Sequence, residues 1–171
     1  MDLDRYIGKD VPESEALQNL RSAHLGSRYL ETIACSAPYE SVALEALHAI
    51  VRAYGGCVIS TLFLVISKTP FEAVAMAALT FLDELPSDRC RSYKNWHIIV
   101  AAINGKHEKV ALKALEILDR HPEHYGSYLD IFIAESSFES VSLEAYGNFL
   151  RRKAYEPDDF AHFAGEAKFR S

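Results

Sequence analysis

The amino-acid sequence predicts an all-α protein in which about four pairs of antiparallel helices stack in a row between capping helices. Three observations support this fold class. A short apolar motif occurs four times, each copy follows another helical stretch, and segments typical of β-strands are nearly absent. The chain has 171 residues, which is enough for one domain with a substantial core, so we interpret residues 1–171 as a single domain.

The recurring motif starts with an aromatic residue or His, then Glu, a variable position and Val. A small residue, Leu or Met, a variable position, Ala, and Leu or Tyr follow. The motif valines are Val42, Val74, Val110 and Val141, so the spacings are 32, 36 and 31 residues. Apolar side chains at these positions cover a wide arc of a helix, which must then be packed on two sides by neighbours. The motif Glu falls in the first turn, where it favours the positive end of the helix dipole.

A second helical stretch precedes each copy of the motif. These stretches are Ser27–Ser36, Cys57–Ser67, Arg91–Ile103 and Ser127–Glu135. Pro, Gly and Ser residues between the two helices of each pair indicate tight turns. Residues 57–66 are rich enough in β-branched side chains to suit a buried strand, but they occupy a helix position in the repeat. We predict a helix there, because the period outranks the local propensity.

The two ends of the repeat core, about 13–153, differ from the middle. A degenerate copy of the motif near the N-terminus has Glu15 in the Val position, which indicates the wetter face of a terminal repeat. Near the C-terminus, a Pro followed by two acids begins a short segment at about 157–169. Its Phe160 and Phe163 fall on one side, and we expect this capping helix to close the last apolar groove.

The four Val-small-Leu/Met-x-Ala-Leu/Tyr blocks resemble those of HEAT-repeat and armadillo-like α-solenoids. The resemblance implies a right-handed solenoid in which the second helices line a concave surface where partners dock. Positions three, six and ten after each motif Val would face solvent on that surface. The candidate partner-binding residues are therefore Glu45, His48, Arg52, Thr80, Glu84, Lys113, Glu116, Arg120, Glu144 and Arg151.

Composition restricts the partner and the compartment. A net charge of −6 argues against nucleic acid as the main partner and suits a basic protein. No apolar run is long enough to span a membrane, and the acidic N-terminus lacks the features of a signal peptide. Three cysteines without a CxxC pair suit free thiols in a reducing compartment. We therefore expect a cytoplasmic protein without a membrane partner.

Local clusters give weak signals for chemistry. His121 and His124 are separated by a Pro that breaks the helix, so a polar turn is favoured over a metal site. The basic and aromatic segment Arg89–His97 is interpreted as a helix start with Trp96 inward and the charges solvated. Its alternative is a hot spot for a protein or a nucleic acid. We predict no catalytic residue, no metal and no cofactor.

The predicted function is a non-catalytic protein–protein interaction module: an adaptor, a scaffold or an inhibitor such as an immunity-type protein. The alternative is a HEAT-like enzyme, acting on DNA bases or resembling a bilin lyase, or a nucleic-acid binder that uses Arg89–His97. The oligomeric state is left open by the sequence. An assembly of identical chains would be indicated by an apolar patch over Phe160, Phe163 and Phe169.

Overall fold

The protein is described by a computed structural model over residues 3–8, 10–54, 58–85, 91–120 and 126–153. These ranges contain ten α-helices and no β-strand, so the all-α prediction is confirmed for them. The odd-numbered helices are α1 Asp4–Ile7, α3 Ser27–Ser36, α5 Ile59–Lys68, α7 Arg91–Asn104 and α9 Gly126–Glu135. The even-numbered helices are α2 Glu13–Ser22, α4 Glu40–Tyr54, α6 Glu72–Glu84, α8 Glu108–Asp119 and α10 Glu139–Lys153.

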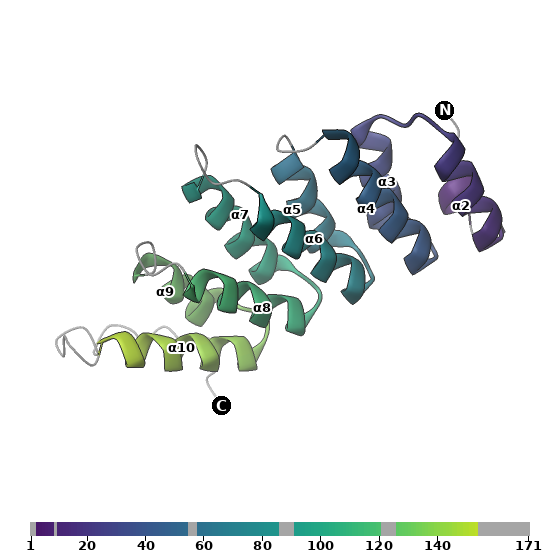
Figure 1. Ribbon diagram of the computed structural model, residues 1–171. Helices are drawn as coiled ribbons and strands as arrows, with labels where there is room; N and C mark the ends of the chain where they lie inside the picture. The colour runs from purple at the N-terminus through teal and green to yellow at the C-terminus, as the bar shows by residue number, and fades with distance from the viewer. Residues whose placement is uncertain (1–2, 9, 55–57, 86–90, 121–125, 154–171) are drawn as a thin grey trace.

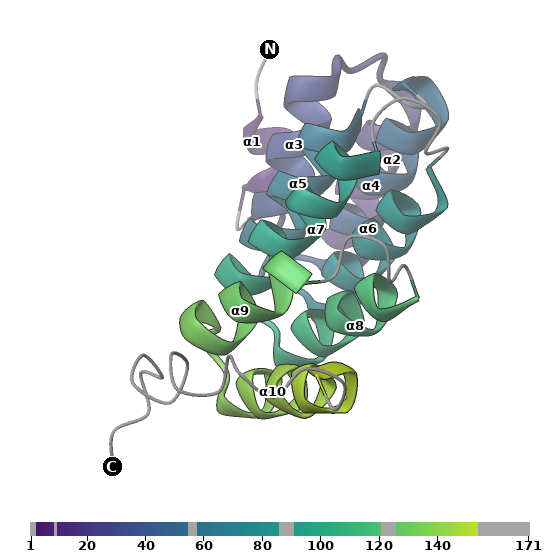
Figure 2. The same cartoon turned by 90° about the vertical axis from the view of Figure 1, so that its left-hand side faces the viewer.

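The helices lie in two layers. In one layer α3 packs on α5, α5 on α7 and α7 on α9, and in the other α2, α4, α6, α8 and α10 follow one another in the same way. The layers are joined by contacts within consecutive pairs, such as α3 with α4 and α5 with α6. Figure 1 shows the resulting row from α2 at one end to α10 at the other, and Figure 2 shows the two layers nearly end-on.

The apolar motif supplies the core of the even-numbered layer. The four motif valines are at most 1% exposed. The alanines four residues further along are buried as well, at 0% exposure, which lets neighbouring helices approach closely. Burying a valine side chain contributes roughly 2 kcal/mol relative to leaving it in water. The motif therefore recurs because every helix of this layer is packed on more than one side.

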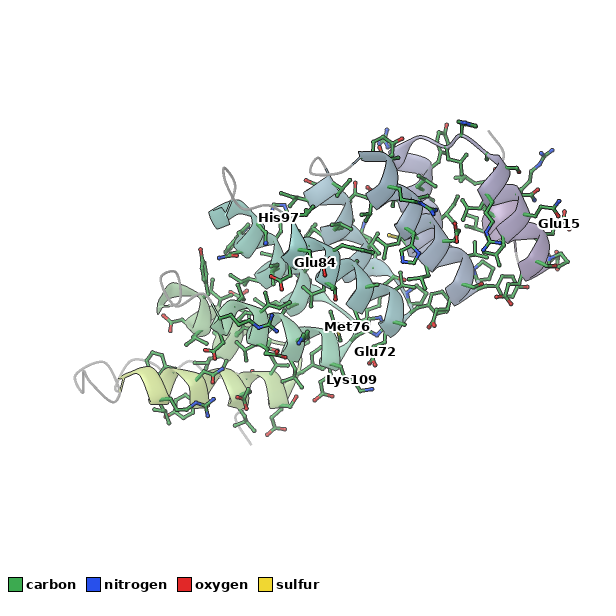
Figure 3. The ribbon with its side chains drawn as sticks, viewed as in Figure 1. Glu15, Glu72, Met76, Glu84, His97 and Lys109 are labelled. Atoms are coloured by element: carbon green, nitrogen blue, oxygen red, sulfur yellow. The ribbon has the colours of Figure 1, made fainter. Side chains whose placement is uncertain are left out.

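The first-turn Glu of the motif has a role that its place near the helix dipole did not predict. On α6, Glu72 accepts a hydrogen bond from Lys109 Nζ of α8 at 3.0 Å, and Figure 3 shows the two side chains at the same end of these helices. An equivalent link occurs three times along the layer, in the pairs Ser41–Glu13, Lys109–Glu72 and Ser140–Glu108. The motif Glu thus connects one even-numbered helix to the next.

Most predicted helix positions are confirmed, with small shifts at the ends. The segment rich in β-branched residues forms α5, as the repeat period predicted. The short helix α1 was not predicted from the sequence; it packs on α2 and α3, with Tyr6 buried at 6% exposure. Glu15 is exposed, as expected for a terminal repeat. The predicted C-terminal helix at 157–169, like His121 and His124, lies outside the described residues.

Within the described ranges, no helix combines the length and the apolar character needed to cross a lipid bilayer.

Candidate partner-binding face

The predicted partner-binding residues lie on α4, α6, α8 and α10, and several of them form ion pairs with one another. At the N-terminal end, Glu45 accepts a hydrogen bond from Arg52 Nη2 at 3.0 Å. The second contact of its carboxylate is Arg21 of α2, with 3.6 Å between nitrogen and oxygen. The hydrogen bond from Arg52 is the main cause of a lowered pKa of the Glu45 carboxyl. Glu45 therefore stays ionised between two arginines.

A second cluster of charges joins α8 to α6. Glu116 is paired with Lys113 at 2.8 Å and with Arg120 at 2.6 Å. Hydrogen bonds from these two side chains lower the pKa of Glu116, the one from Lys113 most. Arg120 also lies 3.7 Å from the Asp83 carboxylate of α6, an interaction across the repeat that the sequence did not predict.

The third cluster, on α10, repeats the geometry of the first. Glu144 and Arg151 are seven residues apart, as Glu45 and Arg52 are, and their side chains meet at 3.1 Å. In both pairs the residues lie two helical turns apart on the same face. The exposed charges of this face therefore largely neutralise one another, and isolated surface pairs of this kind contribute only about 0–1 kcal/mol each.

The remaining predicted residues are engaged differently. Thr80 donates a hydrogen bond to the Met76 carbonyl at 2.9 Å, and the His48 ring packs edge-on against Phe81 with 5.8 Å between ring centroids. Glu84 is exposed, and among the described residues it forms no ion pair. Figure 3 shows Met76 and Glu84 on the same helix, α6. Of these side chains of α6, that of Thr80 is tied to its own helix and that of Glu84 adds an exposed carboxylate to the face.

A groove that the sequence did not predict lies at the N-terminal end of this face. It consists of two adjoining hollows of about 540 Å³ and 510 Å³ that share Leu20, Ala23 and Ala49. Arg21, Glu45 and Arg52 give the first hollow a mainly polar lining, whereas the second has a mainly apolar lining that includes Leu25, Leu30 and Ala53 with Tyr54.

The groove results from the unequal lengths of two packed helices. Helix α2 ends at Ser22, after 10 residues, whereas α4 has 15 residues and continues to Tyr54. The chain leaves α2 in an extended conformation at Ala23, so on the side of α2 the last turns of α4 border the connecting loop and Leu30 of α3. Tyr54 donates a hydrogen bond to the Leu25 carbonyl at 3.4 Å, which ties that loop to α4. In the sequence, the only signal was the pair of small residues at Ala49 and Ala53, one turn apart.

The basic and aromatic segment is oriented differently from the prediction. Trp96 was expected to point inward and the charges to be solvated, but Trp96 is 48% exposed and Lys94 is only 7% exposed. The Lys94 ammonium donates to two carbonyls at the end of α6, those of Asp83 and, at 3.1 Å, Leu85. Carbonyls in the last turn of a helix lack intrahelical partners, so this cation satisfies them.

This orientation weakens the case for nucleic-acid binding by the segment. The Lys94 charge is held against backbone carbonyls, and the ring of His97 packs edge-on on Phe63 at 5.3 Å between centroids. Arg89 and Cys90 lie outside the described residues. Among the described side chains of the segment, those of residues 94–97, the exposed indole is therefore accompanied by no exposed cation.

Cys35 is the one cysteine within the described ranges, and the surroundings of its half-buried thiol disfavour the thiolate form. It donates a weak hydrogen bond to the Leu64 carbonyl, with Sγ 3.8 Å from the oxygen. Burial, and to a smaller extent the nearby Glu31 carboxylate, raises the pKa of the Cys35 thiol to about 11. Because the thiolate is the nucleophile, a thiol with this pKa reacts slowly at neutral pH.

We expect iodoacetamide at pH 8 to alkylate Cys35 roughly 100-fold more slowly in the folded protein than after unfolding in urea, because the thiolate fraction falls tenfold per unit of raised pKa. The alkylation rate of the folded protein should rise about tenfold per pH unit while the pH stays below the thiol pKa. Mass spectrometry of the peptide containing Cys35 measures both rates. Equal rates for folded and unfolded protein would contradict the buried placement of this thiol.

No arrangement typical of a metal site occurs in the described part of the chain, where no three His, Cys, Asp or Glu side chains gather. Comparisons with protein family models, with curated proteins and with solved structures find no match to this chain.

Proposed function

We propose that the chain is a right-handed, HEAT-like α-solenoid that serves as a non-catalytic protein-interaction module. Two features support the solenoid: the motif recurs with a spacing of 31 to 36 residues, and each even-numbered helix packs on the next one in the row. Repeat proteins of this architecture use an extended face for binding. Such a module would act as an adaptor, a scaffold or an inhibitor in the cytoplasm.

The partner docks on the face of the even-numbered helices, with the groove between α2 and α4 as its anchor point. The observation that carries this proposal is the groove itself, in which a mainly polar hollow bordered by Arg21, Glu45 and Arg52 adjoins a mainly apolar one. Binding energy at protein interfaces concentrates where a large apolar side chain fills a pocket and polar groups around it exclude water. The groove offers one such pocket on this face.

The charged clusters explain how the face would discriminate between partners. Each of the carboxylates of Glu45, Glu116 and Glu144 already has a cationic neighbour. A basic partner, which the net charge of −6 favours, must therefore compete with these internal cations for the same carboxylates. Electrostatics would then steer the encounter, while affinity depends on the apolar anchor in the groove.

The test fills the groove without disturbing the core. Ala49→Trp places an indole in the groove from a half-buried position, and Ser60→Trp places the same side chain on an exposed position of α5 in the other layer. Proteins that co-purify from the native host are compared between these two variants and the wild type. We expect at least tenfold less of the specific partner with Ala49→Trp and an unchanged amount with Ser60→Trp.

Two results would contradict the groove as the anchor. One is equal recovery of the same partners with Ala49→Trp and with the wild type. The other is loss of the partner with Ser60→Trp alone, which would place the binding face on the odd-numbered layer.

A further inference from the structure

Two apolar side chains on α10 are exposed at motif positions that are covered in every other copy. Leu143 is 62% exposed and Tyr146 is 38% exposed. They stand two and five residues after the motif Val. At the first of these positions the internal helices have a half-buried residue, and at the second a leucine at most 1% exposed. The internal counterparts of Leu143 are Leu44, Met76 and Leu112, and those of Tyr146 are Leu47, Leu79 and Leu115.

The exposure follows from the position of α10 in the row. Helix α10 packs on α8 and on α9, so it has a preceding neighbour and a partner in the other layer. Its motif residues that face these helices stay covered, as Ser142 at 5% and Ala145 at 0% exposure show. The described part of the chain supplies no following helix. The exposed side chains therefore lie on the face of α10 that corresponds to the face by which α4, α6 and α8 contact the next helix of the layer. Figure 2 shows α10 at the end of the row.

This face has the pattern of a helix–helix seam. Leu143, Tyr146, Gly147 and Leu150 follow one another at i, i+3, i+4 and i+7, so they form one stripe along the helix. A Cβ built on Gly147 would have Arg151 Nη1, at 3.7 Å, as its nearest neighbour, an ordinary contact with the end of a flexible side chain, so a Cβ fits there without a clash. Small residues in such a stripe let a second helix approach closely.

The stripe is complementary to itself when a second copy of α10 lies antiparallel to it. About a midpoint between Tyr146 and Gly147, Leu143 of one helix falls opposite Leu150 of the other. The same alignment places the Tyr146 ring over Gly147 of the second copy, so a large side chain meets the one position without a side chain. A two-fold axis produces both contacts twice, as in an isologous dimer.

The charges beside the stripe favour the same alignment. Glu144 and Arg151 lie on one edge of the stripe, 3.1 Å apart within the helix. A two-fold axis brings the same edge of both copies together, and antiparallel helices then place Glu144 of one copy near Arg151 of the other. A parallel two-fold arrangement would instead place the charged edges of the two copies on opposite sides of the contact, without this pairing.

We propose that two copies of this chain form a symmetric dimer through antiparallel contact of their α10 helices, each covering the apolar stripe of the other. The contact is small, so we expect a dissociation constant in the micromolar range, on the order of 10 µM. The dimer holds two partner-binding faces in a fixed relation, and a partner with two matching sites would gain avidity from it.

Sedimentation velocity of the full chain at several concentrations around that dissociation constant tests the dimer. We expect the wild type to shift from monomer to dimer, Leu143→Glu to remain a monomer, and Trp96→Glu, which changes a similarly exposed apolar residue on α7, to dimerise like the wild type. Glu144→Arg should weaken the dimer at least tenfold, and adding Arg151→Glu should restore it. A monomeric wild type at every concentration, or dimers that Leu143→Glu leaves unchanged, would overturn the proposal.

Gly147→Gln separates a role in the interface from a role in the fold. Gln favours helix formation more than Gly, and a Cβ at position 147 makes only an ordinary contact with the end of the Arg151 side chain, so the melting temperature of the dilute monomer should rise. The same side chain blocks the place of Tyr146 from the second copy, so the dissociation constant should increase at least tenfold. A lower melting temperature together with an unchanged dimer would overturn the proposed contact.

The competing occupant of the stripe is the segment 154–171 of the same chain, which contains Phe160 and Phe163. The double variant Phe160→Glu/Phe163→Glu, measured in the full chain, decides between the two. An unchanged melting temperature and an unchanged dimer support the second copy. A lower melting temperature in a chain that is monomeric throughout would overturn the proposal in favour of this segment.

Discussion

Replacing Val74 by aspartate is expected to unfold the protein at physiological temperature. The Val74 side chain is 0% exposed, in the middle of the even-numbered layer, where α6 packs on both α4 and α8. A carboxylate without a partner in such surroundings costs several kcal/mol, a large part of the roughly 5–15 kcal/mol by which a typical domain is stable. We expect the helical circular dichroism signal to be lost, or the melting temperature to fall by more than about 10 °C.

The neighbouring residue provides a matched control. Ala73 is exposed and lies in the first turn of α6, where an acid interacts favourably with the helix dipole. Ala73→Asp should therefore change the free energy of unfolding by no more than about 0.5 kcal/mol. Equal melting temperatures for the two variants would contradict the buried position of the motif Val, and with it the packing of the even-numbered helices in a row.

The repeat made the helix positions predictable. The motif Glu was expected in a first turn, and α4, α6, α8 and α10 all begin at that residue. One copy alone would not have decided between strand and helix for the apolar segment that forms α5, because its β-branched residues suit both. The recurrence decided it, since the packing of one helix pair on the next requires the same element in each copy.

The rotation of α7 could not be predicted, because it depends on a distant backbone. The sequence pattern allowed either Trp96 or Lys94 to face inward, and hydrophobicity favoured the tryptophan. The end of α6 presents the carbonyls of Asp83 and Leu85 at this place, and the lysine satisfies them. Their position depends on where α6 ends and how α7 packs beside it, which no local pattern encodes.

The sequence predicted which helix face carries the candidate site, but not the groove in that face or the ion pair between its helices. The motif positions placed Glu45, Arg52 and the other charged residues on the even-numbered helices. The groove depends on α2 being shorter than α4, and the pairing of Arg120 with Asp83 depends on the stagger of α8 against α6. Lengths and staggers are set by tertiary packing, and helix ends are the least predictable part of a sequence pattern.

Replacing Lys94 by methionine should be the second most damaging of these changes. Methionine keeps the length of the side chain and suits a buried position, but it cannot donate to the carbonyls of Asp83 and Leu85. Hydrogen bonds from a charged group contribute about 1.5–3 kcal/mol each, and a buried carbonyl left without a donor costs a similar amount. We expect the free energy of unfolding, measured with urea, to fall by roughly 2–4 kcal/mol with an unchanged m-value.

Lys106 is the matched control for this change. Its ammonium also donates to a backbone carbonyl, that of Lys68, at 3.1 Å, but the Lys106 side chain is exposed. Water replaces the donor there, so Lys106→Met should cost less than about 0.5 kcal/mol. Equal losses for the two variants would mean that the Lys94 ammonium is solvated, and the orientation of α7 would then have to turn Trp96 toward the core. A large loss for Lys94→Met alone ties that orientation to the two carbonyls at the end of α6.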